Sequence, residues 1–344
     1  MGRFLGPAAG FAGVIALAVT GCSGGSGGTS DAAPAATGTP GSTGTPGSST
    51  SHSTAYAPYV SATEASGNDA TGSPATYNLA FVLSDGSRCT PKWNGTRSVT
   101  DSAVASRISR LKRDGATVRV SFGGASGTEL ARTCDSASEL AAAYGAALDA
   151  AGADQADFDI EGDTLADSSS VALRSAAIAL LQQERPGLKV SFTLPVMPSG
   201  LDAEGLSLLE SANTHDVQVS TVNIMTMNYG ESFTGDMGGY ALASAKAAHS
   251  QLKKVFGLTD AGAWRGMAVT SMIGVNDVSG ETFTLSDAAQ VRTFAKEKEL
   301  AWVSMWATFR DRPCEDGASV REEAATNCSG VSQRTGAFAT AFAG

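Results

Sequence analysis

The run Asp154-Gln-Ala-Asp-Phe-Asp-Ile-Glu-Gly162 places four carboxylates in a segment whose other residues are typical of a buried strand. Side chains alternate between the two faces of an extended strand, so Asp157, Asp159 and Glu161 would share one face, opposite the apolar residues between them. Carboxylates held this close raise the pKa of at least one of their number. The run therefore predicts a strand that presents a carboxylic acid kept protonated for general-acid chemistry.

Two other interpretations of this run fit less well. A calcium-binding loop also begins with alternating aspartates and a glycine, but it needs a bidentate Glu at its twelfth position, where this chain has Ser168. Phe158 and Ile160 give strand alternation rather than a hydrophilic loop. A solvated acidic edge strand would alternate in the same way, but helix-like runs at 140–151 and 171–181 predict a strand covered by helices.

The first residues indicate export. Arg3 precedes an apolar stretch, residues 11–19, and the sequence then reaches Val-Thr-Gly-Cys at Cys22, which resembles a bacterial lipoprotein signal. The resemblance implies removal of residues 1–21 and lipidation of Cys22, since the apolar stretch is short for a transmembrane helix. An ordinary signal peptidase would also accept this site. We expect a protein on the outer face of the bacterial cell membrane, or a secreted one.

Residues 22–73 consist largely of Gly, Ser, Thr, Ala and Pro, a composition that cannot bury enough apolar surface to fold. The sequence therefore predicts a disordered tether from the lipidated cysteine, with a boundary that could come as early as residue 54. Membrane contact is expected through the anchor alone. The catalytic domain is expected to span residues 55–344.

Apolar strands alternate with amphipathic helices through this domain, which predicts an α/β fold, a single (β/α)₈ TIM barrel. No Gly-x-Gly-x-x-Gly follows the first strands and no Walker motif occurs, so the alternative of an open, doubly wound nucleotide-binding sheet lacks support. The expected strands are 56–60, 77–83, 117–122, 156–161, 189–194, 221–229, 266–272 and 301–306. The expected helices include 101–112, 138–151, 171–183, 240–255 and 286–299.

Charge and histidine content exclude several functions. The net charge of −10 opposes nucleic acid as a substrate, since phosphate binding needs clustered Lys and Arg, and a neutral polymer fits better. The three histidines, His52, His215 and His249, lie in the tether or in or near helical segments, so none is expected to serve a Ser or Cys nucleophile. No cofactor or metal is implied, and a monomer is expected.

Cysteine usage agrees with export. Apart from Cys22, the chain has Cys89, Cys134, Cys314 and Cys328, an even number that allows two disulfides in any of three pairings. Cys89 and Cys134 would follow neighbouring strands at one face of a barrel, so we expect them to pair with each other and Cys314 to pair with Cys328. A zinc site is not expected without Cys-x-x-Cys spacing or a nearby pair of histidines.

Several motifs together resemble glycoside hydrolase family 18, the chitinases, and its bacterial chitinase-D-like branch. The acidic run resembles the catalytic signature of that family, and the likeness extends from about Ala57 to Asp311. The other matching segments are Ser121-Phe-Gly-Gly124, Leu194-Pro-Val-Met-Pro198, Met227-Asn-Tyr229, Met272-Ile-Gly-Val-Asn-Asp277, Met305-Trp306 and Arg310-Asp311.

The resemblance implies hydrolysis with retention, in which the acetamido carbonyl of the substrate attacks its own anomeric carbon. Glu161 would be the general acid and base, Asp159 would orient and stabilise the charged intermediate, and Asp157 would tune Asp159. Residues of the other motifs would take the remaining roles. Tyr229 would bind the acetamido oxygen, Trp306 would form the hydrophobic floor under the sugar, and Ser121 would support the aspartates. The residues expected near the sugar are Met227, Asn228, Gly123 and Gly124, and Asp154 would be structural.

The resemblance also implies a non-proline cis peptide bond at Ala80-Phe81 or at Trp306-Ala307. The chain departs from the family pattern at Gln155, which replaces the usual Gly, at Asn228, a position often acidic in this branch, and at Gly230, where many members have Asp. Too few residues separate Gly274 from Glu299 for the extra α+β domain of processive relatives. We therefore expect a shallow groove suited to soluble chitooligosaccharides or amorphous chitin.

Three alternatives remain open on sequence alone. An endo-β-N-acetylglucosaminidase acting on N-glycans uses the same acidic signature, and only loop shape separates it from a chitinase. A surface lectin that binds chitooligosaccharides without turnover is opposed by the presence of Glu161, which lectin relatives commonly lose. A solute-binding lipoprotein would share the lipid anchor, but such proteins form two lobes around a hinge rather than repeated βα units.

Overall fold

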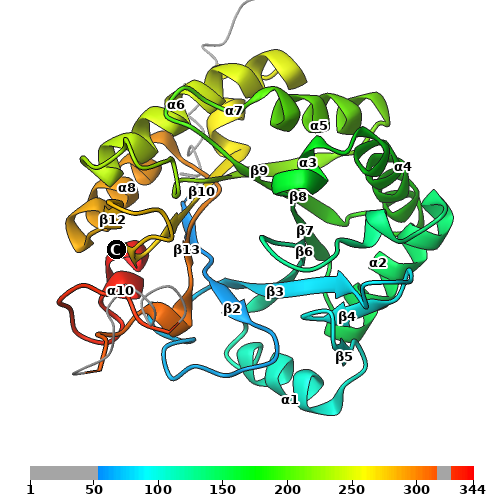
Figure 1. The fold of residues 1–344 in the computed structure, drawn as a ribbon, viewed down its shortest axis with the longest axis horizontal. Helices are drawn as coiled ribbons and strands as arrows, with labels where there is room; N and C mark the ends of the chain where they lie inside the picture. The colour runs from blue at the N-terminus through cyan, green and yellow to red at the C-terminus, as the bar shows by residue number, and fades with distance from the viewer. Residues whose placement is uncertain (1–52, 316–326) are drawn as a thin grey trace, which may run out of the picture. The chain divides into compact units, whose positions relative to one another are not determined.

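The computed structural model describes residues 53–315 and 327–344. Its framework is a sheet in which successive strands run parallel and are joined through helices, so the fold is α/β with a mostly parallel sheet (Figure 1). The parallel series is β3 (Thr76–Ser84), β6 (Thr117–Gly123), β7 (Gln155–Asp159), β8 (Lys189–Pro195), β9 (Val219–Met225), β10 (Met267–Met272) and β13 (Trp302–Trp306).

The first described residues pair with both ends of this series. β1 (Ala55–Tyr56) lies parallel to β13, and β2 (Tyr59–Ser61) lies parallel to β3. Between them, Ala57 N donates to Val303 O at 3.0 Å, and Pro58 O accepts from Asn78 N at 2.9 Å. The strand expected over 56–60 is therefore two short strands that change partner at Pro58, which has no N–H to donate.

Two small antiparallel elements extend this arrangement. β4 (Pro91–Trp93) and β5 (Arg97–Ser98) form a hairpin on β3, and β11 (Gly274–Val275) pairs with β12 (Thr282–Phe283). The second hairpin is all that stands between β10 and the next helix, and no α+β insertion occurs in this described segment.

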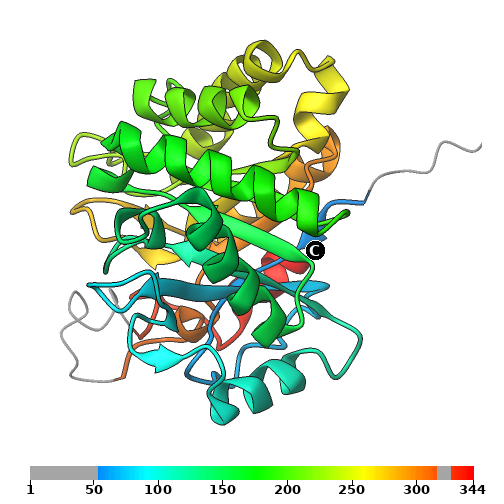
Figure 2. The same cartoon turned by 90° about the vertical axis from the view of Figure 1, so that its right-hand side faces the viewer.

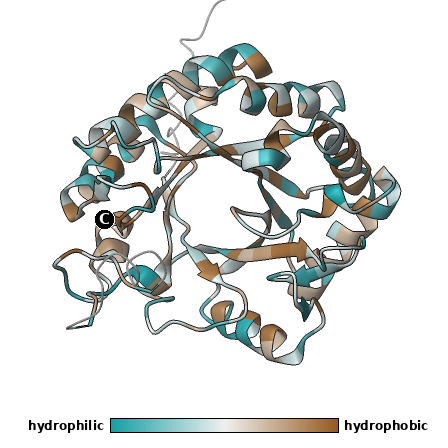
Figure 3. Ribbon diagram, in the orientation of Figure 1, coloured by the Kyte–Doolittle hydropathy of each residue, from teal (hydrophilic) through white to brown (hydrophobic). Residues whose placement is uncertain are grey.

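The helices lie outside the strands in Figure 1, and Figure 2 shows several of them side by side along one flank of the sheet. Both hydrophilic and hydrophobic residues occur along the long helices (Figure 3). They are α1 (Ser102–Leu111), α2 (Ala137–Ala151), α3 (Gly162–Ala166), α4 (Ser168–Glu184), α5 (Ala203–Thr214), α6 (Met237–Phe256), α7 (Asp260–Arg265), α8 (Leu285–Lys298) and α10 (Ala337–Ala343).

Alternate residues of the central strands point to opposite faces of the sheet, one covered by the helices and the other facing away from them. Phe122, Phe158 and Phe192 face the helices, where Phe158 lies 5.3 Å from Phe122, 5.7 Å from Phe192 and 5.0 Å from Tyr144 of α2, between ring centroids. All four rings are buried. The neighbouring Asp157 therefore points to the opposite face of the sheet, as the alternation in the sequence predicts.

Two expected strands end earlier in the structure. β7 ends at Asp159, and Glu161 is the N-cap residue of α3 instead of the last residue of the strand. β9 ends at Met225, and Asn228 then adopts a φ of 54°, which an extended strand does not allow. Met227 and Tyr229 therefore lie beyond β9, although the expected strand 221–229 includes both, and strand alternation does not orient them.

The N-terminal part of the described chain is packed into the fold. Asp69 pairs with Arg107 at 2.9 Å and accepts from Thr308 Oγ1 at 2.7 Å, and Asn68 donates to Asp311 O at 2.9 Å. Because Asn68 and Asp69 are buried, the packed part of the chain begins before residue 73, the later of the two boundaries that the sequence allows for the tether. The expected signal at 1–21, Cys22 and the tether up to residue 52 lie outside the described residues. Among the described helices, none combines the length and apolar character that spanning a bilayer requires.

Both expected disulfides are present: Cys89 is bonded to Cys134, and Cys314 to Cys328. The two cysteines of the first bond are 45 residues apart and those of the second 14 residues apart. A cross-link restricts the unfolded chain more when the loop it closes is longer.

Replacing both Cys89 and Cys134 by Ser should lower the free energy of unfolding by about 4 kcal/mol, since the bond closes the longer loop. The matched change at Cys314 and Cys328 should cost about 3 kcal/mol. Urea unfolding of each double variant beside the wild type measures the difference. A larger loss for the shorter loop would contradict the chain-entropy argument.

Candidate active site

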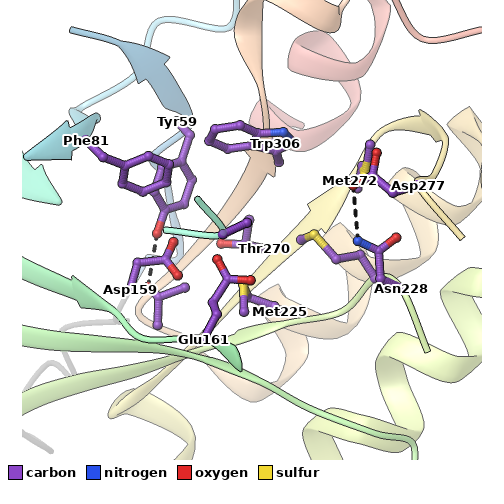
Figure 4. Close-up of a pocket in the computed structure, with 13 residues that line it drawn as sticks. Tyr59, Phe81, Asp159, Glu161, Met225, Asn228, Thr270, Met272, Asp277 and Trp306 are labelled. Carbon is purple, nitrogen blue, oxygen red and sulfur yellow. Dashed lines mark hydrogen bonds between the residues drawn. The ribbon is translucent and has the colours of Figure 1, made fainter. Parts of the chain in front are cut away.

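A pocket of about 200 Å³ lies where β7, β8, β9, β10 and β13 end. The carboxyl ends of parallel strands are where the active sites of α/β enzymes lie. Figure 4 shows the acidic and aromatic side chains that point into it. The lining residues are Tyr59, Phe81, Ala125, Asp159, Glu161, Thr193, Met225, Met227, Asn228, Thr270, Met272, Asp277 and Trp306.

Asp157 lies beneath the pocket, where four hydroxyl groups hold its carboxylate. Its Oδ2 accepts from Tyr59 at 2.9 Å and Ser121 at 2.7 Å, and its Oδ1 accepts from Ser191 at 2.7 Å and Thr193 at 2.8 Å. These hydroxyls come from β2, β6 and β8, so three strands besides β7 fix the orientation of this side chain. Ser121, to which the resemblance gives a supporting role, is thus one of the residues that contact Asp157 directly.

Asp159 stands one pleat above Asp157 and reaches the pocket. It is 4% exposed, and its Oδ1 has no hydrogen-bond partner among the described residues. Burial raises the pKa of Asp159 well above its usual value, and the negative charges of Glu161 and Asp157 and a hydrogen bond with Glu161 raise it further. Asp159 therefore keeps a proton at a pH where an exposed aspartate is ionised.

Glu161 lies at the start of α3, half-buried, with its carboxyl group directed into the pocket (Figure 4). Burial raises the pKa of Glu161, the hydrogen bond with Asp159 lowers it, and the negative charge of Asp277 raises it. Asp159 and Glu161 thus form a hydrogen-bonded pair of acids with raised pKa values. Such a pair can hold a proton near neutral pH and donate it to a bound ligand.

An aromatic wall forms one side of the pocket. Trp306 stacks on Phe81 with 5.5 Å between ring centroids, and the ring of Tyr59 lies 5.8 Å from that of Trp306 (Figure 4). The peptide bonds Ala80-Phe81 and Trp306-Ala307 are both cis, which confirms the expectation at each place. Flat aromatic faces of this kind pack against the apolar face of a sugar ring.

The opposite side of the pocket carries Asn228 and Asp277, whose side chains are joined by a hydrogen bond of 3.3 Å from Asn228 Nδ2 to Asp277 Oδ2 (Figure 4). Glu281 holds the turn around Asn228, since its carboxylate accepts from Gly230 N at 2.8 Å. The hairpin after β10 thereby fixes the segment after β9. It also brings a third carboxylate, Asp277, to the same pocket as the two on β7 and α3.

A second hollow, of about 250 Å³, continues from the first. Glu161, Met225, Met227 and Asn228 line both hollows. Pro195, Val196, Met197 and Asp202 complete the lining of the second one. Glu161 therefore lies where two ligand units could meet, one in each hollow.

The remaining residues expected in the site lie elsewhere. A Cβ on Gly123 would overlap Asp159 O, and a Cβ on Gly124 would lie 2.8 Å from the Phe81 ring, so the two glycines give these residues room rather than lining the pocket. Tyr229 is buried away from the pocket, where Ser244 Oγ donates to its hydroxyl at 3.3 Å. Asp154 is exposed at the start of β7.

The placement of Tyr229 differs from the expected contact with the acetamido oxygen. Asn228 takes a left-handed conformation and points into the pocket, so the next side chain turns toward α6, where it packs against Phe233 and Tyr240. The polar groups that face this part of the pocket are instead Asn228 and Asp277. The direction of the Tyr229 side chain and its burial depend on where β9 ends, which the sequence did not predict correctly.

Sequence reasoning gave no role to several lining residues. Asp277 belongs to a quoted segment, and its position directly after a strand end was the available signal. Tyr59 and Phe81 also lie at strand ends, but their aromatic character alone is typical of core packing. The described residues contain no cluster of three or more His, Cys, Asp or Glu that could hold a metal ion.

The chain is similar to several known proteins. A chitinase domain from Pyrococcus furiosus, the active domain 2, solved as catalytic-site mutants complexed with chito-oligosaccharides, superposes with a TM-score of 0.74 and 29% sequence identity. The match covers 83% of this chain and 92% of that one. This chain is thus similar to a chitinase domain over most of its length. A family 18 chitinase from Pseudoalteromonas aurantia, 14% identical with a TM-score of 0.53, shares the fold.

Two curated relatives of this chain have longer sequences. The probable bifunctional chitinase/lysozyme of Escherichia coli K12 is 35% identical over 277 residues, which are 75% of this chain and 31% of that protein. Endochitinase 11 of Metarhizium anisopliae is 34% identical over 251 residues, 69% of this chain and 48% of that protein. The chain thus spans less than half the length of these relatives. No family model matches the sequence.

Proposed function

We propose that this chain is a chitinase that hydrolyses β-1,4 bonds between N-acetylglucosamine units. The observation that carries the proposal is Glu161, an acid with a raised pKa, at the junction of two adjacent hollows. A glycosidic oxygen has one sugar on each side, so a proton donor between two sugar sites is what its cleavage needs. The aromatic wall and the exposed polar pair Asn228 and Asp277 suit an amphipathic, uncharged sugar.

Glu161 would protonate the leaving oxygen and later activate the water that completes hydrolysis. The acetamido group of the sugar beside Trp306 would attack the anomeric carbon, and its carbonyl oxygen would form the new bond as the glycosidic bond breaks. Asp159, whose proton is shared with Glu161, would then offer its negative charge to the cationic ring so formed. Asn228 and Asp277 are the groups placed to orient the acetamido group, since Tyr229 is turned away.

The finer details of the fold and the cell biology belong to the same proposal. β1 and β2 would close the parallel strands into an eight-stranded barrel, which their pairing with β13 and β3 supports. Membership of the chitinase-D-like branch and lipidation at Cys22 on the outer face of the membrane rest on the sequence motifs. The short hairpin β11 to β12 supports action on soluble or amorphous chitin.

The test is release of product from 4-methylumbelliferyl chitobioside and chitotrioside by the purified protein, with proton NMR of the first sugar product. Hydrolysis with the β-anomer formed first is expected for a retaining mechanism. An inverted first product would refute substrate assistance. Cleavage of an N-glycan core without cleavage of these chitin mimics would assign the endo-β-N-acetylglucosaminidase activity, and binding of chitotriose without turnover of any substrate would identify a lectin.

Changing Asp277 to Asn should move the alkaline limb of the pH–rate profile to lower pH. The negative charge of Asp277 raises the pKa of Glu161, and a general acid must be protonated to act, so its removal lets Glu161 lose its proton at a lower pH. The profile of kcat for chitotrioside hydrolysis measures the shift. Asp216→Asn, at an exposed aspartate away from the pocket, is the matched control. A profile of Asp277→Asn that coincides with the control would contradict this role.

A further inference from the structure

A buried arginine lies one pleat beneath the acids of β7. Arg119 precedes Ser121 by two residues on β6, and Gln155 precedes Asp157 by two residues on β7. Ser121 Oγ donates to Asp157 at 2.7 Å, and Arg119 Nη2 donates to Gln155 Oε1 at 2.9 Å. The arginine and glutamine therefore form the cross-strand pair directly below the serine and aspartate, about 7 Å away along the strands.

The guanidinium of Arg119 is held by neutral partners. Besides Gln155, its Nη1 donates to Asn78 Oδ1 at 2.6 Å, and its Cζ lies 3.9 Å from the centroid of the Trp302 ring. Neither hydrogen bond goes to a carboxylate. Gln155 is itself fixed, because its Nε2 donates to Thr117 Oγ1 at 3.1 Å. This charge is 6% exposed, and within the described part of the chain its hydrogen bonds go to two side-chain amides, so it needs compensation from the nearest opposite charge.

That opposite charge is on the acids above. The groups that face Arg119 electrostatically are Asp157 on β7 and the Tyr59 hydroxyl on β2, and Asp159 and Glu161 continue the acidic column toward the pocket. An arginine remains protonated at any pH used for an assay. The interior of the sheet thus carries a permanent positive charge on the side of the acids that faces away from the substrate.

We propose that Arg119 is a positioning residue for hydrolysis, whose buried charge compensates the carboxylates of β7 and whose guanidinium is aimed by Gln155. Gln155 stands where the family resemblance has a glycine, and its amide fills that space with the acceptor that Arg119 uses. The inference rests on the proposed chitinase activity for its kinetic consequence. Arg119 touches no reacting atom and acts through Asp157 and Asp159.

Weakening this charge should make the acids take up protons at higher pH. Asp159 lies four residues along the strand from the level of Arg119, about 13 Å away. At that distance and an effective dielectric constant of about 20, removal of the arginine charge corresponds to about one pH unit. Arg119→Met keeps the length of the side chain on Trp302 and removes the charge. We expect the acidic limb of its pH–rate profile to move up by that amount, with KM on the plateau unchanged. Arg119→Lys keeps the charge and should restore the wild-type limb.

Gln155→Glu tests the same point in a variant of nearly identical shape. Its carboxylate would pair with Arg119, and the Thr117 hydroxyl could turn to donate, so the charge felt by Asp157 falls without loss of packing. The same upward move of the acidic limb is expected, while Gln218→Glu, at an exposed position, should leave the limb in place. A purely structural arginine would change thermal stability in these variants but not the pH dependence.

Superimposable profiles for wild type, Arg119→Met and Gln155→Glu would overturn the inference. If Arg119→Met does not fold, Gln155→Glu decides alone. A carbon-13 NMR titration of the aspartate and glutamate carboxyl groups in wild type and Gln155→Glu gives a readout independent of turnover: the interior acids should protonate at higher pH in the variant. Carboxyl resonances that titrate at the same pH in both proteins would refute the inference about Arg119, whether or not the wild type hydrolyses chitin mimics. Absence of hydrolysis by the wild type would count against the proposed function and not against this inference.

Discussion

Glu161→Gln should retain chitotriose binding and lose turnover by on the order of a thousandfold or more, because glutamine fills the same space and can neither donate a proton nor activate water. The loss should appear in kcat, with KM for 4-methylumbelliferyl chitotrioside within a few-fold of the wild type, since the aromatic wall is unchanged. The pH dependence of the residual activity should lose its alkaline limb, because that limb reports the ionisation of Glu161.

The control for this substitution is Glu210→Gln, at an exposed glutamate on α5 that lines neither hollow. It should match the wild type in kcat, KM and melting temperature. Turnover by Glu161→Gln at the rate of this control would remove Glu161 from the chemistry. Isothermal titration with chitotriose separates that result from a variant that has lost the binding site.

Asp159→Asn should lower kcat by about 10²- to 10³-fold, with a smaller effect on KM. The amide keeps a hydrogen-bond donor toward Glu161 but cannot carry the negative charge that stabilises a cationic intermediate. Burial raises the pKa of Asp159, so the one proton of the resting pair lies on Asp159. Asp159 becomes charged when this proton passes to Glu161, which delivers it to the leaving oxygen. The asparagine therefore imitates the resting state and fails in the transition state.

Single-turnover kinetics on 4-methylumbelliferyl chitobioside measure this effect directly, since they follow formation of the intermediate. Asp163→Asn, an exposed acid on the adjacent helix, serves as the control and should behave as the wild type. If Asp159→Asn slowed only a later step and left the first step at the wild-type rate, its assigned role in forming the intermediate would be wrong.

The sequence predicted the parallel α/β framework because strand alternation and helical periodicity survive in each unit, as in β6 and α2. It also predicted that Asp157 and Asp159 lie on one face of β7, opposite Phe158, since this depends on residues within one strand. Tyr229 was misplaced for a non-local reason. Its direction depends on a left-handed turn that Glu281, 52 residues further along the chain, holds from another hairpin.

The difference between local and long-range contacts also explains which pocket residues the sequence did not predict. Tyr59 and Phe81 meet Trp306 only when the first and last strands are brought together, and no local pattern encodes that meeting. The place of Asp277 in the pocket depends on its hydrogen bond with Asn228, which is 49 residues away in the sequence. Gln155, noted only as a departure from the family pattern, gains its meaning from Arg119 on the neighbouring strand.

The four hydroxyl contacts of Asp157 tie the catalytic machinery to the integrity of the whole sheet. The donors come from β2, β6 and β8. If any one of these strands separates from the sheet, Asp157 loses a hydrogen bond that orients it beneath Asp159 and Glu161. A partly opened molecule is therefore an inactive one. Catalytic competence and native structure should vanish together on heating, so that turnover serves as a direct count of intact molecules.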